Sequence, residues 1–145
     1  MLSNAFKNLD RRRWIDRNQP QTLAIATWLL YIEGAFAIVG WIDRSDLYGA
    51  WSRTHAAGII ALVAALSFVV GPFLMANGKR LGWWLSVGAA ASPWVLRIIF
   101  RLEFPVVTLR WVITQNDTIG FLFEAALLAL VLHPQSREHE RRWLH

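Results

Sequence analysis

The chain has 145 residues, 55% of them hydrophobic, and carries a formal net charge of +5 with a pI near 10.7. The apolar residues gather in long blocks separated by short charged connectors, which is typical of a chain embedded in a bilayer rather than a water-soluble domain. The absence of cysteine excludes disulfides, thiolate nucleophiles and iron–sulfur clusters. Because the basic residues lie in the connectors, as they do in cytoplasmic loops, we expect lipid and not nucleic acid as the partner.

The first segment, residues 1–19, is polar and basic. Its apolar residues fall at helical spacing, which predicts a short amphipathic helix on the membrane surface: Leu2, Ala5, Phe6 and Leu9. A solvated tail without structure explains the same composition equally well. Either interpretation makes residues 1–19 a cytoplasmic or interfacial segment outside the membrane.

The first apolar block runs from Thr22 to Trp41 and predicts a helix that begins at Pro20 and ends near Ile42. About 20 residues at 1.5 Å each match a hydrocarbon layer of roughly 30 Å. One carboxylate, Glu33, interrupts the block near its middle. A bare charge in lipid costs several kcal/mol, so Glu33 must have a partner, hold a proton or face water.

A short, polar, turn-rich connector at residues 43–51 follows. The second helix is predicted to begin after Ser52 as N-cap and to run to about Asn77, with Gly78 as its C-terminal stop. Pro72 lies inside this helix and predicts a kink, because proline removes one backbone hydrogen bond.

The third helix is predicted over residues 81–102, with Pro93 as a second source of a kink. The second and third helices are joined by a tight turn and should pack as an antiparallel hairpin. Small residues at intervals of four predict the faces through which the two helices meet: Ala57, Ala61 and Ala65 in one, and Gly88 and Ser92 in the other.

Residues 103–117 permit two interpretations. Apolar and polar residues alternate there, which predicts an extended amphipathic segment, while a short interfacial helix beginning at Pro105 is the alternative. A fourth helix is then predicted from an Asp117 cap to about His133, where Pro134 ends it. It is short for a membrane span.

Taken together, these elements predict an all-α protein with a four-helix transmembrane bundle over residues 20–134, kinked in its second and third helices, and a charged tail over residues 135–145 that is helical or disordered. Most basic residues fall in residues 1–19, in the turn Lys79–Arg80 and in the tail. This bias predicts a multi-pass protein of the cell (inner) membrane with both termini in the cytoplasm.

Counting along the predicted helices places a few polar side chains at similar depth near the middle of the membrane: Glu33, Glu124, Ser67 and Ser92, with Arg97 within reach above them. One interpretation of this cluster is a proton or cation relay, or a polar pocket for a small substrate. The alternative is structural, an ion pair of Arg97 with Glu33 or with Glu124 that holds the helices together.

The histidines and the motifs predict no cofactor, no metal and no enzymatic activity. His55 and His133 fall at opposite ends of their helices, so they cannot ligate one haem together. His139 and His145 are six residues apart in the tail, not at the i, i+4 spacing of a helical metal pair. The sequence contains no phosphate-binding loop, nucleophile elbow or zinc-protease motif.

The predicted arrangement of helices resembles that of small four-helix bacterial integral membrane proteins of unknown function. The stretches that carry the resemblance are the turn GKRLGWW (78–84) and the helix end LLALVLHP (127–134). The stretch YIEGAFAIVG (31–40) is also similar to the glutamate segment of the small multidrug resistance family. That resemblance implies that Glu33 is a site shared by protons and cationic substrates. The basic tail, the segment 103–117 and Glu124 depart from that family's pattern.

We therefore expect a non-enzymatic accessory or scaffold protein of the membrane, with a membrane-protein partner or a second copy of itself. The alternative is a proton-linked carrier of a small molecule that uses Glu33 within an oligomer.

Overall fold

A computed structural model of the protein describes residues 8–54 and 56–144. The regular secondary structure within these residues consists of helices, joined by turns and loops. The helices are α2 (Gln21–Asp43), α3 (Leu47–Thr54), α4 (Ala56–Ala76), α5 (Arg80–Glu103), α6 (Leu109–Thr114), α7 (Thr118–Leu132) and α8 (Pro134–Trp143).

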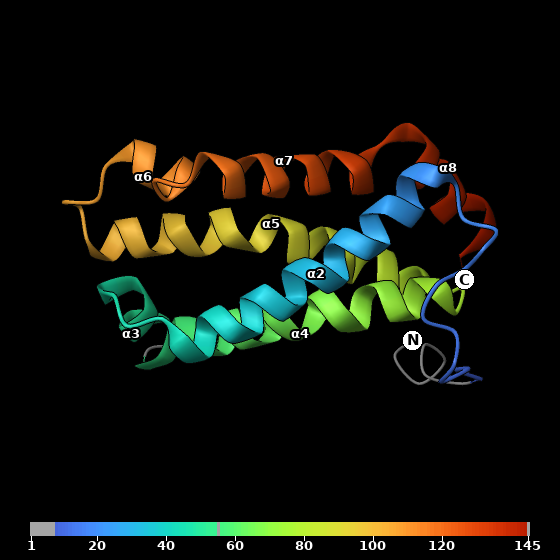
Figure 1. Cartoon of the computed structure of the whole chain (residues 1–145), viewed down its shortest axis with the longest axis horizontal. Helices are drawn as coiled ribbons and strands as arrows, with labels where there is room; N and C mark the ends of the chain where they lie inside the picture. The colour runs from blue at the N-terminus through green and yellow to red at the C-terminus, as the bar shows by residue number, and fades with distance from the viewer. Residues whose placement is uncertain (1–7, 55, 145) are drawn as a thin grey trace.

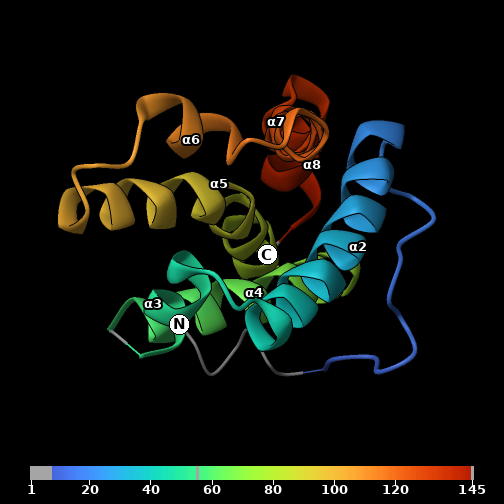
Figure 2. The same ribbon diagram turned by 60° about the vertical axis from the view of Figure 1, so that its left-hand side comes forward.

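The four long helices lie side by side along one axis, with α2 running obliquely across the others (Figure 1). In the described residues, three helices (α2, α4 and α5) are long and apolar enough to cross a membrane, and α7 with α8 makes a fourth candidate bent by 45°. The helices α3 and α6 lie at one end of the bundle, which we call the α3/α6 end (Figures 1 and 2). The prediction of an all-helical protein with several helices long and apolar enough to cross a membrane is confirmed for the described residues.

The opposite end, which we call the basal end, holds the described part of the N-terminal segment (residues 8–19), the α4–α5 turn and α8 (Figure 1). Arg80 at the start of α5 forms an ion pair with Glu140 of α8. The Thr22 hydroxyl, at the start of α2, lies 3.3 Å from the Ser136 hydroxyl of α8. The N-terminal segment, the α4–α5 turn and the C-terminal helix therefore share one end of the molecule.

Several helix boundaries agree with the signals in the sequence. Pro20 is the residue before α2, and Asp117 caps α7 by accepting a hydrogen bond from the Ile119 amide at 3.1 Å. Gly78 follows α4 with a positive φ of 72°, a conformation that glycine adopts without steric cost. Pro134 ends α7 and also opens α8, because proline is tolerated in the first turn of a helix.

The start of the second span was predicted wrongly. Ser52 does not cap α4; it lies buried inside α3, and its hydroxyl donates to the Gly49 carbonyl at 3.0 Å. The connector 43–51 therefore contains a helix where a turn was predicted. The Asp46 carboxylate accepts from the Gly49 amide at 2.8 Å, which is the hydrogen bond of an N-cap residue.

The contact between α4 and α5 also differs from the prediction. Gly88 is exposed, and a Cβ built on it would meet nothing within 4 Å. The helices approach most closely at Gly71 and Gly82, where a Cβ on Gly82 would lie 2.6 Å from the Gly71 carbonyl oxygen. A Cβ on Gly71 would lie 2.6 Å from the Ser86 hydroxyl. The face of α5 that meets α4 is therefore the one carrying Gly82 and Ser86.

The segment between α5 and α7 is neither extended nor helical from Pro105. It holds one short helix, α6, whose first turn is capped by the Thr108 hydroxyl, which accepts from the Trp111 amide at 3.3 Å. The following residues, Gln115 and Asn116, have positive φ values of 51° and 61°. This left-handed pair reverses the chain so that α7 can run back toward the basal end.

At the N-terminus, residues 8–19 form turns and contain no helix. The amphipathic helix predicted for residues 1–19 depends on Leu2, Ala5 and Phe6, which lie outside the described residues, as do His55 and His145. In the tail the helical alternative is the one found, as α8. Both α4 and α5 continue through their prolines, Pro72 and Pro93.

The interior divides into two unlike halves. The half nearer the basal end is filled by one cluster of buried apolar side chains: Leu23, Ala26, Leu30, Phe68, Met75, Trp83, Ala89, Ala90, Leu127, Val131 and Leu144. At the α3/α6 end a small aromatic cluster centres on Trp51 and Phe100, whose rings lie 5.1 Å apart. Between the two clusters lies a region that contains charged side chains, among them Arg97 and Glu124, and this region holds the candidate site.

One side chain, Asn77, ties the N-terminal segment to the end of α4. Its Oδ1 accepts from the Asp10 amide at 2.8 Å, and its Nδ2 donates to the Arg13 carbonyl at 3.1 Å. An Asn77→Ala change removes both hydrogen bonds, each of which contributes about 0.5–1.5 kcal/mol. We expect trypsin to cut at Arg11–Arg13 several-fold faster in this variant while the bundle stays folded. Gln135→Ala, an exposed residue of α8, should leave the rate unchanged; equal rates for both variants would contradict the prediction.

Candidate functional site

A cavity of about 260 Å³ lies between α2, α4, α5 and α7 on the α3/α6 side of the apolar core. Four charged side chains line it: Glu33, Arg44, Arg97 and Glu124. The rest of its wall is largely apolar and aromatic, with Phe36, Trp41, Phe68, Pro93 and Leu96 among the lining residues. Pockets for drug-sized ligands usually measure about 300–1,000 Å³, so this cavity fits a small molecule.

One face of α2 supplies much of the lining. Glu33, Ala37, Gly40, Trp41 and Arg44 recur at helical spacing, so their side chains lie on the same side of the helix. A Cβ built on Gly40 would meet nothing within 4 Å, which shows open space beside it. The residues of this face place a carboxylate in the middle of the span and a guanidinium just beyond its end.

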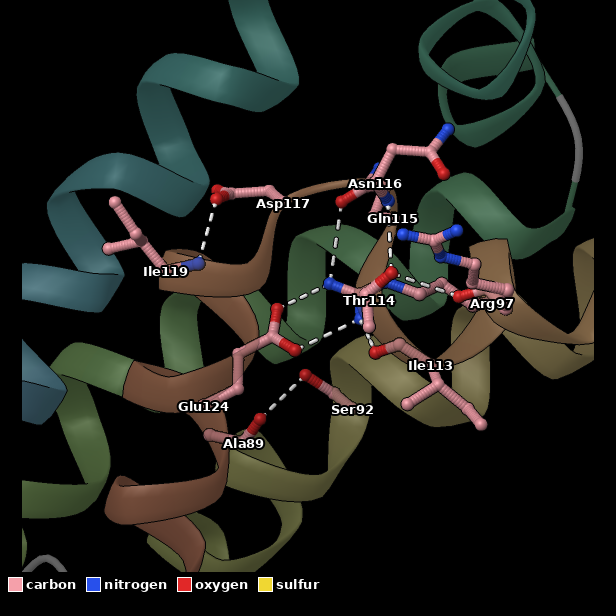
Figure 3. Close-up of polar contacts among 11 residues, drawn as sticks. Ala89, Ser92, Arg97, Ile113, Thr114, Gln115, Asn116, Asp117, Ile119 and Glu124 are labelled. Atoms are coloured by element: carbon pink, nitrogen blue, oxygen red, sulfur yellow. Dashed lines mark hydrogen bonds and ion pairs between the residues drawn. The ribbon is translucent and has the colours of Figure 1, made fainter.

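The most constrained group in the cavity is the Arg97 guanidinium. It forms a two-pronged ion pair with Glu124 of α7 (Figure 3): Nη1 donates to Oε2 at 2.9 Å, and Nη2 donates to Oε1. Arg97 is only 5% exposed. Two charges taken out of water are stabilised only when each satisfies the other, so this pair holds α5 and α7 together.

The turn after α6 completes the surroundings of Arg97. Nη1 also donates to the Ile113 carbonyl oxygen at 3.1 Å, and Nη2 lies 3.4 Å from Gln115 Oε1 (Figure 3). If the Gln115 amide is turned over, its oxygen instead lies 2.5 and 2.6 Å from the two Nη atoms of Arg44. Gln115 therefore stands between two guanidinium groups at the border of the cavity.

Arg44 is held at the α3/α6 side of the cavity by its neighbours. Its Nε lies 3.1 Å from Asp46 Oδ1, and its guanidinium carbon lies 5.1 Å from the centre of the Tyr48 ring. A guanidinium over an aromatic face is attracted by the ring's quadrupole. The charge of Arg44 is thus partnered, like that of Arg97.

Tyr48 connects the cavity to the aromatic cluster of the α3/α6 end. Its ring lies edge-on to Phe100 and to Trp111, at 5.1 and 5.4 Å. Burial raises the pKa of its phenol, and the charges of Arg97 and Arg44 oppose that rise in part. The phenol is therefore neutral near pH 7 and can donate a hydrogen bond.

Glu33 differs from the other three charged residues of the cavity. Within residues 8–54 and 56–144, no hydrogen bond or ion pair joins its carboxylate to another side chain or to the backbone. It is half-buried and lines the cavity from α2. Of the two pairings open to Arg97, the structure contains the one with Glu124, which leaves Glu33 available to a proton or a ligand.

Of the two serines in the predicted cluster, one lines the cavity and the other does not. Ser92 lines the cavity, although its hydroxyl donates to the Ala89 carbonyl of its own helix at 2.7 Å. Ser67 is not among the lining residues, and its hydroxyl donates to the Val63 carbonyl at 2.7 Å. The structure therefore brings together Glu33, Arg97, Glu124 and Ser92 of the predicted cluster, and places Ser67 elsewhere.

Sequence reasoning missed Arg44, Tyr48 and Gln115. Arg44 lies at the i+11 position from Glu33, on the same face of a helix, and this spacing was the available signal. Tyr48 and Gln115 gave no such signal, because their positions depend on how α3 and the α6 turn fold back over the bundle.

The described histidines are not drawn into the site. His133 lies between α7 and α8, where its Nδ1 accepts from the Gln135 amide at 3.3 Å, and His139 lies on α8. In the described parts of the chain, no three His, Asp or Glu side chains gather closely enough to hold a metal ion. Comparison with protein-family models, with curated proteins and with solved structures finds no match, so no activity is carried over from a relative.

Proposed function

We propose that this protein is a multi-pass membrane protein that binds a small solute in the cavity and exchanges it against a proton at Glu33. The observation that carries the proposal is the contrast between the two acids: Glu124 is neutralised by Arg97, whereas Glu33 lines the same cavity without a partner among residues 8–54 and 56–144. An unpartnered carboxylate within a span is expected to hold a proton or a ligand.

The shape of the interior supports transport in preference to catalysis. The cavity is bordered at the α3/α6 end by Arg44, Tyr48 and Gln115, and at the basal end by the apolar core. The serine that lines it in α5, Ser92, donates its hydroxyl hydrogen to the Ala89 carbonyl of its own helix and not to a base that would activate it as a nucleophile. We infer a binding site that faces one side of the membrane in this conformation.

The orientation follows from charge. The three basic segments share the basal end, so we propose that this end, with both termini, faces the cytoplasm of the cell. The cavity then faces the opposite side of the cell membrane. A second copy of the chain would be needed to enclose a complete pathway, because four helices surround little space.

The test is a Glu33→Gln variant in proteoliposomes that contain a pH-sensitive dye. Two solutes that carry a permanent quaternary ammonium group serve as ligands: tetramethylammonium and glycine betaine. We expect at least one of them to drive a proton flux through the wild-type protein and neither to do so through the variant. The free energy of unfolding should change by less than about 1 kcal/mol, because Glu33 forms no hydrogen bond to another described residue that the change would break.

Glu138→Gln, which alters an exposed carboxylate of α8, is the matched control and should keep the flux. If the wild-type protein carries neither solute, or if Glu33→Gln carries them as well, the proposal fails. The accessory role expected from the sequence would then be favoured. It requires that a fixed partner co-purifies in mild detergent and that Glu33→Gln leaves that partner bound.

A further inference from the structure

The C-terminal helix α8 is fixed across the basal end of the bundle. Its residues Ser136, Glu140 and Leu144 are buried, and they follow one another at four-residue intervals, so they mark the face that meets the bundle. Ser136 contacts Thr22, Glu140 pairs with Arg80, and Leu144 joins the apolar core. These contacts determine which way every other side chain of α8 points.

Arg137 and Arg141 each follow a buried residue by one position. Their side chains are therefore turned about 100° around the helix axis from the buried face. Both are exposed, and they lie together on one flank of α8, beside the base of the bundle. Arg137 is in the first turn after the end of α7 at Leu132. This flank therefore lies where the headgroups of the surrounding lipids begin.

The two arginines of this flank have no ion-pair partner within the part of the chain that the structure describes. Arg142 pairs with Glu138 at 2.6 Å, and Glu140 pairs with Arg80, whereas no hydrogen bond or ion pair engages the guanidinium of Arg137 or Arg141 within the described residues. Like charges at i, i+4 repel one another and destabilise a helix. Both line a groove of about 420 Å³ with Pro134, Glu138 and Arg142.

We propose that Arg137 and Arg141 form a binding site for the phosphate of an anionic phospholipid. A phosphodiester placed between the two guanidinium groups would relieve their repulsion and accept hydrogen bonds from both forks. Trp143, which is 67% exposed on the other flank of α8, suits the same headgroup depth. This lipid site shares no residue with the cavity, so the lipid-binding proposal can be tested independently of the proposed transport.

The experiment compares phosphatidylglycerol with phosphatidylcholine of identical acyl chains, each titrated into the full-length protein in mild detergent. Native mass spectrometry counts bound lipid, and thermal unfolding reports stabilisation. We expect phosphatidylglycerol to bind at least about tenfold more tightly and to raise the unfolding temperature. Arg137→Gln/Arg141→Gln should lose this preference, and Arg137→Lys/Arg141→Lys should keep part of it.

Arg110→Gln, an exposed arginine of α6 at the other end of the bundle, is the matched control and should retain the full preference. Equal affinity for the two lipids, or an undiminished preference in Arg137→Gln/Arg141→Gln, would overturn the proposal. Inorganic phosphate is titrated in parallel. If it displaces phosphatidylglycerol at equal concentration, the site is one for free phosphate and the lipid assignment is wrong.

Discussion

Replacing Gly82 with alanine is expected to drive α4 and α5 apart. The added Cβ would lie 2.6 Å from the Gly71 carbonyl oxygen and 2.8 Å from the Leu74 carbonyl carbon, and it would also clash with the Met75 amide nitrogen. All three atoms belong to the backbone of α4, so no side-chain rotation can make room. Overpacking a core costs about 1–3 kcal/mol when side chains can adjust, and we expect a loss above that range here.

The measurement is unfolding in mixed micelles, followed by circular dichroism, with size-exclusion chromatography to detect aggregation. Gly88→Ala is the matched control, because it makes the same substitution six residues further along α5, at an exposed site with open space around it. Alanine is the better helix former, so Gly88→Ala should be neutral or stabilising by up to about 1 kcal/mol. Equal stability of the two variants would show that α4 and α5 do not meet at Gly82.

Separating Arg97 from Glu124 is expected to have the second large effect. Arg97→Gln leaves the Glu124 carboxylate without its partner, and Glu124→Gln leaves the guanidinium of Arg97 in the same position. Removing one member of a buried ion pair typically costs about 3–5 kcal/mol, because the remaining charge is desolvated and uncompensated. Each single variant should therefore unfold at a clearly lower denaturant concentration than the wild type.

The double variant Arg97→Gln/Glu124→Gln tests whether the two side chains act as a pair. It leaves no charge stranded, so its loss of stability should be well below the sum of the two single losses. The same cycle with Glu33→Gln in place of Glu124→Gln should be additive, since Glu33 does not pair with Arg97. Additive behaviour of Arg97 with Glu124 would contradict the pairing described above.

The spans could be predicted from the sequence because their signals are local. A long apolar run predicts by itself a helix long and apolar enough to cross a membrane, and caps such as Asp117 and Gly78 act within one turn of the helix ends that they mark. The same is true of Glu33 and Arg97, which were recognisable as polar residues inside apolar runs. Local chemistry was sufficient for these features.

The remaining features depend on contacts between distant segments. The helix α3 was missed because it is stabilised by packing: the Trp51 ring lies edge-on to Phe100 in the aromatic cluster, and its indole donates to Glu103 at 2.6 Å. Both Gly82 and Gly88 suit a helix–helix contact, and only the rotation of α5 about its axis decides which of them faces α4. Likewise, the choice of Glu124 over Glu33 as the partner of Arg97 depends on how α7 lies against α5.

The close-packed apolar core fills the basal half of the interior, whereas the half toward the α3/α6 end contains the cavity, and this difference has a mechanical consequence. Close-packed apolar side chains resist sliding, so the basal half behaves as a fixed base for all four long helices. Any tilt of one helix against another must then pivot about this base, and its displacement grows toward α3 and α6. We therefore expect a small tilt of one helix about the apolar core to change the width of the cavity far more than it changes the packing of the core.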